Sequence, residues 1–570
     1  MKRGNRTAFI ALLCGLTVAL SACSGGNSGG ADSGTKPEKD KGTNTAQEGG
    51  SGTETTDGAA KYDPPIEIAL VGGTDDSTEG VLAKLEGETF ENNRWSKLYE
   101  DKLGIRFKYD WIAKGPEQFK QKMNVSLASG DVPDFIQVDA TELKQLQEAD
   151  LIMDVSELYE KYASPLTKEV LKQDGDAPFS AATIDGKLMA VPNIRSSTDM
   201  AQFVWVRTDW LQKLNLPEPK TMQDVLAIAE AFATQDPDGN NKADTVGLLL
   251  QKDLFGGFAG LEGFFNGYHA YPTIWVEDEN GKLVHGSTRP EAKTALAELQ
   301  QMFKKGLFDK EFGVKDAGKT AEAASSGKAG LSFGQQWLSA WPFQSNHDND
   351  PNAVWKGYPL MSIDDKPARP EISLGTYQYW AIRKDVEHPE ALLKMFNLYI
   401  ETNWGETAAF DKYYLPGDAE GTWKLSPVTP EPPNKNLASY LSIADALKNK
   451  KTAELTGEAK TIYNNIEKYE QGDEKLWSWE AGYGLDGVYS VMKDYADTDR
   501  FMMNKFVGAP TPTAVEKSVT LSKLTTETFT RIILGELPVD AFDKFVEDWN
   551  KLGGEKITQE VNEWYEANKK

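Results

Sequence analysis

Residues 236–247 read DPDGNNKADTVG and carry oxygen-bearing side chains at alternating positions. Asp236, Asp238 and Asn240 occupy the first, third and fifth positions, and Asp244 occupies the ninth. Hard cations such as Ca²⁺ take about six to eight oxygen ligands from tight loops of this kind. Lys242 would add its backbone carbonyl at the seventh position. The loop is therefore predicted to hold a structural Ca²⁺, and the alternative is an Asp/Asn/Gly-rich turn without metal.

The same loop departs from the EF-hand pattern at two positions. Asn241 stands at the sixth position, where an EF-hand has Gly, and Gly247 stands at the twelfth, where it has a bidentate Glu. Because every candidate ligand is an oxygen of one loop after a helix, no position is left open toward a substrate. We expect the metal to stabilise the fold rather than to do chemistry.

No catalytic set emerges from local spacing elsewhere in the chain. The four His residues are scattered, and none is spaced as a metal ligand with another His, Asp or Glu. Residues 313–320, GVKDAGKT, match a phosphate-binding P-loop pattern but lack the strand that must precede it. Glu480 in LWSWEAGYG is the carboxylate to test, because its aromatic setting could hold a sugar hydroxyl or raise its pKa. No organic cofactor is expected.

The N-terminus carries an export signal. Lys2, Arg3 and Arg6 precede an apolar run over 8–20 that is too short to stay in a membrane as a spanning helix. The run ends in Leu-Ser-Ala before Cys23, which resembles a bacterial lipobox. This implies removal of residues 1–22, acylation of Cys23 and tethering to the outer face of the cell membrane. Residues 23–60 hold almost no apolar side chain and are predicted to be a flexible tether.

Composition narrows the possible partners of the 570-residue chain. The formal net charge is −25, so the surface repels nucleic acid and anionic lipid. We expect no nucleic-acid partner, membrane association only through the anchor, and a monomer. The two Cys residues both lie in the N-terminal region, so the body has no disulfide or thiolate site. Fifteen Trp residues are many for this length, and Trp faces can serve as platforms for sugar rings.

Strand and helix patterns alternate through the body and predict an α/β architecture. Apolar strands at 66–71 and 105–111 alternate with helices at 91–103 and 116–130, which favours a mostly parallel sheet with helices on both faces. Thr221 and Asp224 predict a capped helix over 221–234, directly before the acidic loop. Roughly 510 residues beyond the tether are too many for one core and predict two or three domains, or two lobes.

Six stretches together resemble the family 1 extracellular solute-binding proteins, the lipoprotein receptors of bacterial ABC importers for sugars and oligosaccharides. They occur in the family's order from about residue 62 to 568, and the C-terminal one is most similar to the long branch found in Gram-positive bacteria. They read SGDVPDFIQVD, FVWVRTDWLQKLNLPEPKTMQDV, GLFDKEF, GKAGLSFGQQW, YWAIRKDVEHPEALLKMFN and DAFDKFVEDWNKLGGEKITQEVNEWY.

The resemblance implies a two-lobed periplasmic-binding-protein fold of type II, with a three-layer α/β sandwich in each lobe. Lobe 1 is expected at about 62–192 plus 378–472, and lobe 2 at about 193–377 plus 473–570. The solute would lie between the lobes, and hinge closure would couple its binding to a change of shape that permease subunits recognise. Some oligosaccharide receptors of the family carry a similar acidic loop with Glu after the last Asp, where this chain has Thr245.

The resemblance also implies which loops form the ligand site. We expect about half of the aromatic candidates to line the cleft and the others to pack in the core. Arg195 is expected to pair either with a ligand carboxylate or with one of the protein's acids. The candidates are Asn193 and Arg195; Gln335, Gln336 and Trp337 at the start of a helix; Tyr377, Tyr379 and Trp380; and Trp477, Trp479, Glu480 and Tyr483.

The sequence thus predicts a lipid-anchored receptor that binds a carbohydrate, most plausibly an oligosaccharide, for an ABC importer and that catalyses no reaction. Two alternatives stay open. One is a cell-surface enzyme that degrades polysaccharides, and the other is a receptor for peptides or another small solute.

Overall fold

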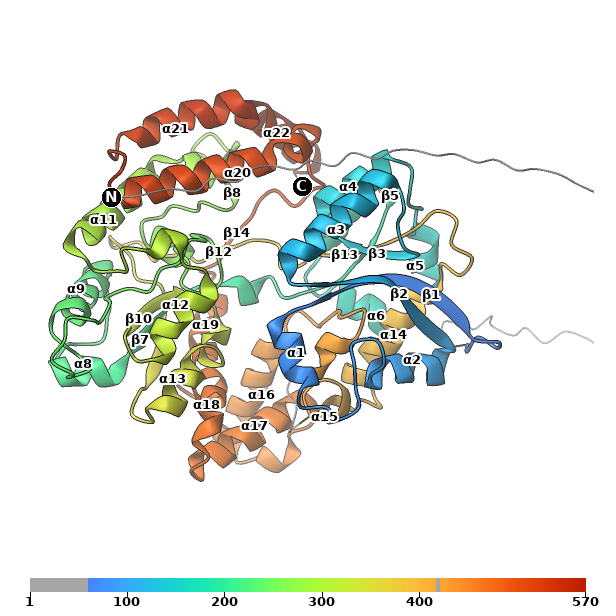
Figure 1. The fold of residues 1–570 in the computed structure, drawn as a ribbon, viewed down its shortest axis with the longest axis horizontal. Coiled ribbons are helices and arrows are strands. Elements are labelled where there is room, and N and C mark those ends of the chain that lie inside the picture. The colour runs from blue at the N-terminus through green and yellow to red at the C-terminus, as the bar shows by residue number, and fades with distance from the viewer. Residues whose placement is uncertain (1–59, 417–420, 570) are drawn as a thin grey trace, which may run out of the picture. The chain divides into compact units, whose positions relative to one another are not determined.

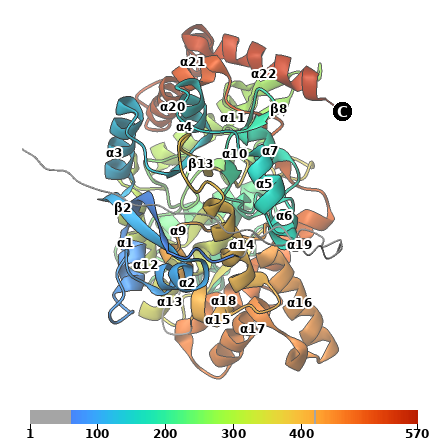
Figure 2. The ribbon, with the colours of Figure 1, turned by 90° about the vertical axis from the view of Figure 1, so that its right-hand side faces the viewer.

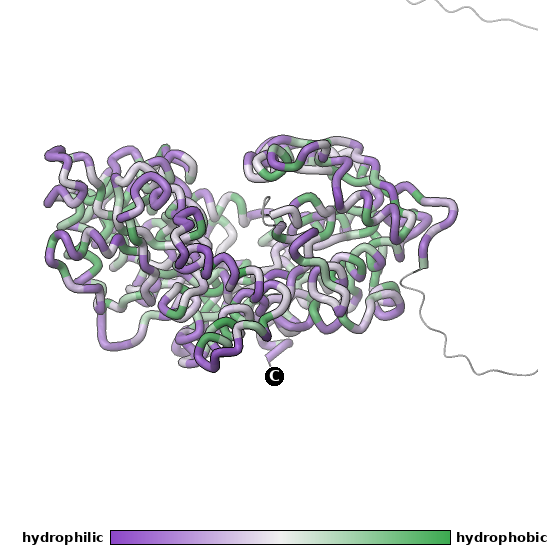
Figure 3. Tube along the Cα trace, turned by 90° about the horizontal axis from the view of Figure 1, so that it is seen from below, coloured by the Kyte–Doolittle hydropathy of each residue, from purple (hydrophilic) through white to green (hydrophobic). Residues whose placement is uncertain are grey.

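The computed structural model describes residues 60–416 and 421–569 (Figure 1). The predicted signal, the acylated Cys23 and the tether up to residue 59 lie outside the described residues. Within the described ranges, no helix is both long and apolar enough to cross a membrane. Hydrophilic segments run along the outside of the body, and apolar segments run through its interior (Figure 3).

Two neighbouring sheets join strands from distant parts of the chain. β1 and β2 pair in parallel, whereas β13 lies antiparallel between β3 and β6. The backbone N–H of Asp134 donates to the carbonyl of Ala69 at 3.1 Å, which brings β3 beside β1. The strands are β1 (Ile66–Thr74), β2 (Ile105–Lys114), β3 (Phe135–Val138), β6 (Val191–Pro192) and β13 (Tyr379–Ile382), with the hairpin β4 (Thr183–Ile184) and β5 (Lys187–Leu188) nearby in the chain.

Helices from two separate segments share one core with these two sheets. Trp95 on α2 is fully buried and stacks on Tyr399 of α14, with 4.8 Å between ring centroids. The predicted starts and stops hold: Pro116 opens α3, and Gly130 ends it at a positive φ of 71°. The helices are α1 (Asp76–Leu82), α2 (Arg94–Leu103), α3 (Pro116–Ser129), α4 (Ala140–Glu148), α5 (Ser156–Tyr162), α6 (Pro165–Leu171), α7 (Ala177–Ala182), α14 (Ala391–Trp404) and α15 (Phe410–Tyr413).

A second core surrounds another sheet. β7 (Phe203–Arg207) lies between β10 (Leu331–Gly334) and β11 (Trp355–Tyr358), and both pairings are antiparallel. The predicted capping box of α9 is present, because Thr221 and Asp224 exchange hydrogen bonds. Around the sheet lie α8 (Thr208–Leu214), α9 (Met222–Thr234), α10 (Glu262–Gly267), α11 (Pro290–Lys305), α12 (Ala317–Ser325), α13 (Phe343–Asn349), the hairpin β8 (Trp275–Glu277) and β9 (Leu283–His285), and the pair β12 (Glu371–Ile372) and β14 (Met502–Met503).

The last part of the chain is helical and divides into two groups. Figures 1 and 2 show α16 to α18 together at one end of the body and α20 to α22 at the other. α16 and α17 pack on each other, and α17 contacts both α15 and α18. These helices are α16 (Lys435–Asn449), α17 (Gly457–Glu470), α18 (Trp477–Tyr483), α19 (Val488–Asp497), α20 (Pro512–Ile533), α21 (Ala541–Trp549) and α22 (Glu555–Asn568).

The expectation of a mostly parallel sheet is wrong in detail. Among the named strands of the described residues, only β1–β2 and β12–β14 pair in parallel. The alternation of strands and helices fixed the direction of β1 and β2, which follow each other. It could not fix the direction of β13 or β11, because these strands enter their sheets after long excursions of the chain through other elements.

Candidate functional site

Two adjoining pockets open where the chain passes from one core to the other. Pocket A, of about 290 Å³, lies at the carboxyl end of β1, and pocket B, of about 400 Å³, lies beside the turn that follows β10. Arg195, Tyr377 and Trp423 line both pockets, so we treat them together as the cleft. The location at a strand's carboxyl end is the one that open α/β sheets favour for ligands.

Large aromatic side chains stay exposed at the cleft. Tyr377 is 60% exposed, Trp337 is 36% exposed, and Trp341, which stands near Trp337, is 41% exposed. The rings of Trp337 and Trp341 stack with 6.2 Å between centroids and 23° between planes. Aromatic rings that serve only to pack the core are buried in the folded protein. Exposed aromatic faces close together at one pocket are therefore typical of a binding surface.

The amide side chain of Gln335 fixes the orientation of Trp337. The indole Nε1 of Trp337 donates to Gln335 Oε1 at 2.6 Å, and a Cβ at Gly257 would lie only 2.7 Å from the same oxygen. Gly at position 257 therefore makes room for the pair. The helix expected at Gln335–Trp337 is a single 3₁₀ turn, Gln336–Ser339, because Pro342 disfavours helical backbone at the residue before it.

Arg195 forms an ion pair with an acid of the protein, which is one of the two outcomes expected from the sequence. Its guanidinium forms an ion pair with Glu431, donates to Thr429 Oγ1 at 2.8 Å and lies over the ring of Trp423. Lys435 extends the network, with its Nζ 3.4 Å from Glu431. The wall of pocket B is thus built from opposite charges that hold one another.

Asp199 lies beside this network in pocket B. Its carboxylate accepts a hydrogen bond from Asn436 Nδ2 at 2.7 Å, and Asn436 Oδ1 accepts one from the hydroxyl of Tyr483 at 3.1 Å. Burial raises the pKa of the Asp199 carboxyl to about 6, although the ammonium of Lys435 acts in the opposite direction. Tyr483 is therefore a support behind the pocket and not part of its lining.

The cleft brings together only part of the predicted ligand set. The candidates that line it are Arg195, Gln335, Gln336, Trp337, Tyr377 and Trp380. The others, which do not line it, are Asn193, Tyr379, Trp477, Trp479, Glu480 and Tyr483.

Packing explains the second group. Asn193 is fully buried and exchanges hydrogen bonds with Thr429. Tyr379 is buried in the first core, and its hydroxyl donates to the carbonyl of Thr376 at 3.2 Å. Trp477 stacks on His347 at 5.1 Å. Burial raises the pKa of Glu480, but this residue of α18 lines neither pocket.

Several lining residues were not predicted. They come mainly from β1, from the turn around Phe90 and from the segment 423–436, and they include Gly72, Asp75, Phe90, Tyr109, Met200, Tyr414, Trp423, Lys424, Glu431, Lys435 and Asn436. The signal that could have found the last segment is the proline-rich run SPVTPEPP at 426–433, shortly after Trp423, which is typical of an irregular segment rather than a helix.

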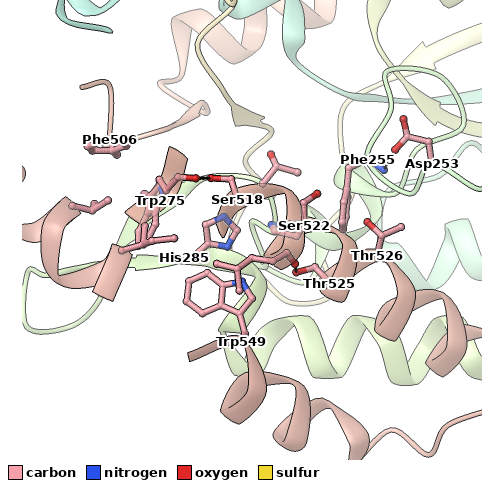
Figure 4. A pocket seen from close by; sticks show the side chains of 16 residues that line it. Asp253, Phe255, Trp275, His285, Phe506, Ser518, Ser522, Thr525, Thr526 and Trp549 are labelled. Carbon is pink, nitrogen blue, oxygen red and sulfur yellow. Dashed lines mark hydrogen bonds between the residues drawn. The ribbon is translucent and has the colours of Figure 1, made fainter. Parts of the chain in front are cut away.

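A further cavity, of about 410 Å³, lies inside the second core and shares no lining residue with the cleft (Figure 4). Trp275, His285 and Trp549 form one wall, and hydroxyl side chains of α20 face them (Figure 4). Burial lowers the pKa of His285 to about 4, so its ring is neutral near pH 7 and bonds to Ser287 through Nδ1.

The acidic loop gathers its predicted ligands around Asn240. The amide Nδ2 of Asn240 donates to Asp238 at 2.6 Å and to Asp244 at 3.0 Å, while the Asp236 carboxylate accepts from the backbone N–H of Asn240. Burial and a hydrogen bond to Asp236 raise the pKa of Asp238, so these two carboxyls also lie close together.

A cation in this loop would need amide and backbone oxygens as ligands besides the carboxylates. Within the described ranges, no three His, Cys, Asp or Glu side chains form a metal cluster by themselves. The backbone N–H of Lys242 donates to Asn240 Oδ1 at 2.7 Å. Thr245 contributes nothing, because its hydroxyl donates to the carbonyl of Phe232 at the end of α9.

Two α/β cores, chain crossings between them and an aromatic cleft at the crossings together define a solute-binding protein of the periplasmic-binding-protein class. The family model described as bacterial extracellular solute-binding protein matches residues 88–406. The chain belongs to this family.

Known relatives agree with this assignment. The chain is 24% identical over 536 residues to the polygalacturonan/rhamnogalacturonan-binding protein YtcQ of Bacillus subtilis (strain 168), covering 91% of this chain and 95% of the relative. It is 28% identical over 249 residues to the fructooligosaccharide ABC transporter substrate-binding protein FusA of Streptococcus pneumoniae serotype 4 (strain ATCC BAA-334 / TIGR4), covering 40% of this chain and 41% of that one.

Solved structures share the fold. FusA of S. pneumoniae in complex with kestose has a TM-score of 0.61 at 17% identity, over 88% of this chain and 100% of that one. The alginate-binding protein AlgQ2 without calcium ion has a TM-score of 0.60 at 15% identity, over 90% and 100%. The two-lobed α/β fold predicted from the sequence is confirmed by these likenesses.

Proposed function

We propose that this chain is the lipid-anchored, extracellular receptor of an ABC importer and that it captures a carbohydrate in the cleft. The exposed aromatic rings of Trp337, Trp341 and Tyr377 carry the proposal. Sugars present apolar C–H faces that stack on such rings, and their hydroxyls pair with amide and charged side chains of the kind that surround them. The sugar-binding relatives support the same class of ligand.

The ligand is proposed to be an oligosaccharide rather than a single sugar. The two pockets measure about 290 and 400 Å³ and meet at Arg195, Tyr377 and Trp423. Sites for ligands of drug size span about 300–1,000 Å³. A chain of several sugar units would occupy both pockets, with Trp423 and Tyr377 at the junction.

Capture would depend on the two lobes, which we place at about 62–192 plus 378–472 and 193–377 plus 473–570. The segments near 193–200, 373–378 and 423–436 supply cleft residues, and the first two lie at boundaries between these lobes. A ligand that touches both sides stabilises the closed form by its extra contacts there. Permease subunits would then distinguish closed from open receptor.

We propose a receptor without catalysis. Three acids line the cleft: Asp75, Asp199 and Glu431. Asp75 accepts hydrogen bonds from Thr78, Asp199 accepts one from Asn436, and Glu431 pairs with Arg195 and Lys435, so none is placed as a general acid or nucleophile beside open space. Glu480, the carboxylate singled out by its aromatic surroundings, belongs to α18 and lines neither pocket.

We propose that the acidic loop binds a structural Ca²⁺ through Asp236, Asp238, Asn240, Asp244 and the carbonyl of Lys242. When bound, the ion supplies electrostatic attraction that holds the carboxylates together. The loop follows α9 and shares no residue with the cleft, which supports a role in stability. The anchor at Cys23, outside the described residues, remains part of the proposal.

A thermal-shift screen followed by calorimetric titration tests the proposal on the chain from residue 24. Oligosaccharides should raise the midpoint, because a ligand that binds only the native state stabilises it by mass action. The double variant Trp337→Ala/Trp423→Ala should lose the shift. Shifts with peptides alone would favour the peptide receptor, and release of shorter sugars from the ligand would establish an enzyme.

A further inference from the structure

Charged side chains line the cleft in equal numbers of each sign. The basic ones are Arg195, Lys424 and Lys435, and the acidic ones are Asp75, Asp199 and Glu431. A binding site for a polyanion needs cations that the protein has not already neutralised, because a carboxylate that leaves water without a partner loses its hydration. Whether an acid of the protein already neutralises each cation therefore determines whether the cleft can bind a negatively charged ligand.

Glu431 neutralises the central cation. It pairs with Arg195 and also lies 3.4 Å from Lys435 Nζ, and it accepts a hydrogen bond from the hydroxyl of Tyr414 at 2.7 Å. The side chain of Glu431 is only 12% exposed. A ligand carboxylate cannot displace an acid held by three donors without leaving Glu431 as a buried charge.

The other two cations also lie near acids of the protein, although only Lys435 forms ion pairs. Lys435 Nζ lies 3.1 Å from Glu458, whose side chain is 9% exposed and lies behind the cleft lining, so this lysine is shared between two acids. Lys424 donates to Ser77 and feels the charge of Asp75, which opposes the lowering of the lysine's pKa by burial. Counting Glu458, the acids around the cleft outnumber the bases.

The protein as a whole adds to this balance, because its formal net charge is −25. A polyanion approaching the cleft meets a repulsive field at long range, and at short range it meets only cations that already lie near acids of the protein. An uncharged sugar is not repelled by the net negative charge and needs no free cation in the cleft. Its hydroxyls can accept from the amides and donate to the carboxylates, and its ring faces can stack on Trp337 and Tyr377.

We infer that the cleft selects uncharged oligosaccharides and rejects chains of uronic acids. The inference rests on the proposed capture of a carbohydrate and goes beyond it by naming the charge of the ligand. Among the relatives, it separates this chain from those named for binding polygalacturonan and alginate, which are polyanions, and places it with the one crystallised with kestose, which is neutral.

The test compares ligands that differ in charge alone. Calorimetric titrations use maltotetraose, cellotetraose and kestose beside their C6-oxidised forms, and oligogalacturonides of equal length as free acids and as methyl esters. For any backbone that binds, the uncharged form should bind at least about tenfold more tightly than the acid at low salt, and added NaCl should narrow the difference.

A charge variant makes the test specific to the cleft. Asp199→Asn removes one lining charge and keeps an oxygen for Asn436, so it should narrow the preference for uncharged ligands. Asp365→Asn makes the same change at an exposed residue outside the cleft and should leave the preference unaltered. Circular dichroism of both variants checks that they fold.

The outcomes are distinct. An acid form that binds as tightly as its uncharged partner, or more tightly, overturns the charge selection and leaves carbohydrate capture standing. If no oligosaccharide of either charge binds, the proposed function itself fails, and the charge selection fails with it.

Discussion

The guanidinium of Arg195 lies over the indole ring of Trp423, with Cζ 5.1 Å from the ring centroid. The two residues come from distant segments of the chain, and both line pocket A and pocket B. The cation and the ring attract each other, which fixes the indole at the junction of the pockets. Because Glu431 holds the other side of Arg195, the position of Trp423 depends on an ion pair that is itself part of the cleft wall.

Replacing Trp423 by Ala should weaken oligosaccharide binding by at least about tenfold, which corresponds to about 1.4 kcal/mol. The variant removes a ring that a ligand would touch in both pockets. Isothermal titration calorimetry measures the loss. Trp564→Ala is the matched control, because Trp564 packs on Phe506, away from the cleft, so its loss should lower the melting temperature and leave affinity unchanged. Unchanged affinity in Trp423→Ala would exclude Trp423 as a ligand platform.

The stacked pair of Trp337 and Trp341 yields a second prediction. Trp341→Ala should lower sugar affinity several-fold with little change in the free energy of unfolding, because Trp341 is 41% exposed and leaves only a small cavity. Ligand-induced changes in tryptophan fluorescence should also shrink. The matched comparison is Trp205→Ala, a fully buried residue of β7, which should cost about 3–5 kcal/mol of stability. A large loss of stability in Trp341→Ala would mean that the ring serves packing.

Removal of Ca²⁺ should lower the melting temperature more than it lowers sugar affinity. The acidic loop follows α9, and its carboxylates repel one another once the ion is gone. Differential scanning calorimetry with and without EGTA measures the first effect, and titration with the ligand measures the second. Asp238→Asn should abolish the response to EGTA.

The control for the loop is Asp278→Asn, which changes one carboxylate in the exposed turn between β8 and β9. This variant should keep the full response to EGTA. A loss of binding on chelation at an unchanged melting temperature would contradict the structural role of the ion.

Local signals in the sequence predicted local structure well. Pro116, Gly130 and the Thr221–Asp224 capping box mark helix ends through backbone geometry and hydrogen bonds within one turn, so no knowledge of the fold is needed. The direction of β13 and β11 was not predictable in this way, because sheet pairing there joins residues far apart in the chain.

The cleft residues were predictable only in part, because the fold brings them together from distant parts of the chain. Gln335 to Trp337 were found because they follow an apolar strand at once, and strand ends favour ligand sites. Trp477 and Trp479 looked equally suitable by type, yet Trp477 stacks on His347 and Trp479 packs against α16 and α17. Residue type gives an aromatic face, whereas only the tertiary packing decides whether water or a side chain covers it.

The buried carboxyl of Glu371 should make stability depend on pH. Glu371 is 4% exposed and accepts hydrogen bonds from Asn266 and Thr273, and burial raises its pKa to about 7. Since the folded protein then holds this proton more tightly than the unfolded chain, the contribution to stability is complete below about pH 4.5. It declines as the pH rises through 7, by up to about 3 kcal/mol.

Glu371→Gln keeps the shape and the hydrogen-bonding oxygen but cannot ionise. Urea unfolding at pH 5 and pH 8 should therefore show a smaller loss of stability with rising pH in this variant than in the parent protein. Glu516→Gln, at an exposed residue of α20, should behave like the parent. His285 has the opposite pH dependence, because burial lowers its pKa to about 4. Its contribution to stability is complete above about pH 6.5 and is lost as the pH falls from there through 4. Equal pH dependence in the parent and in Glu371→Gln would show that Glu371 does not titrate in this range.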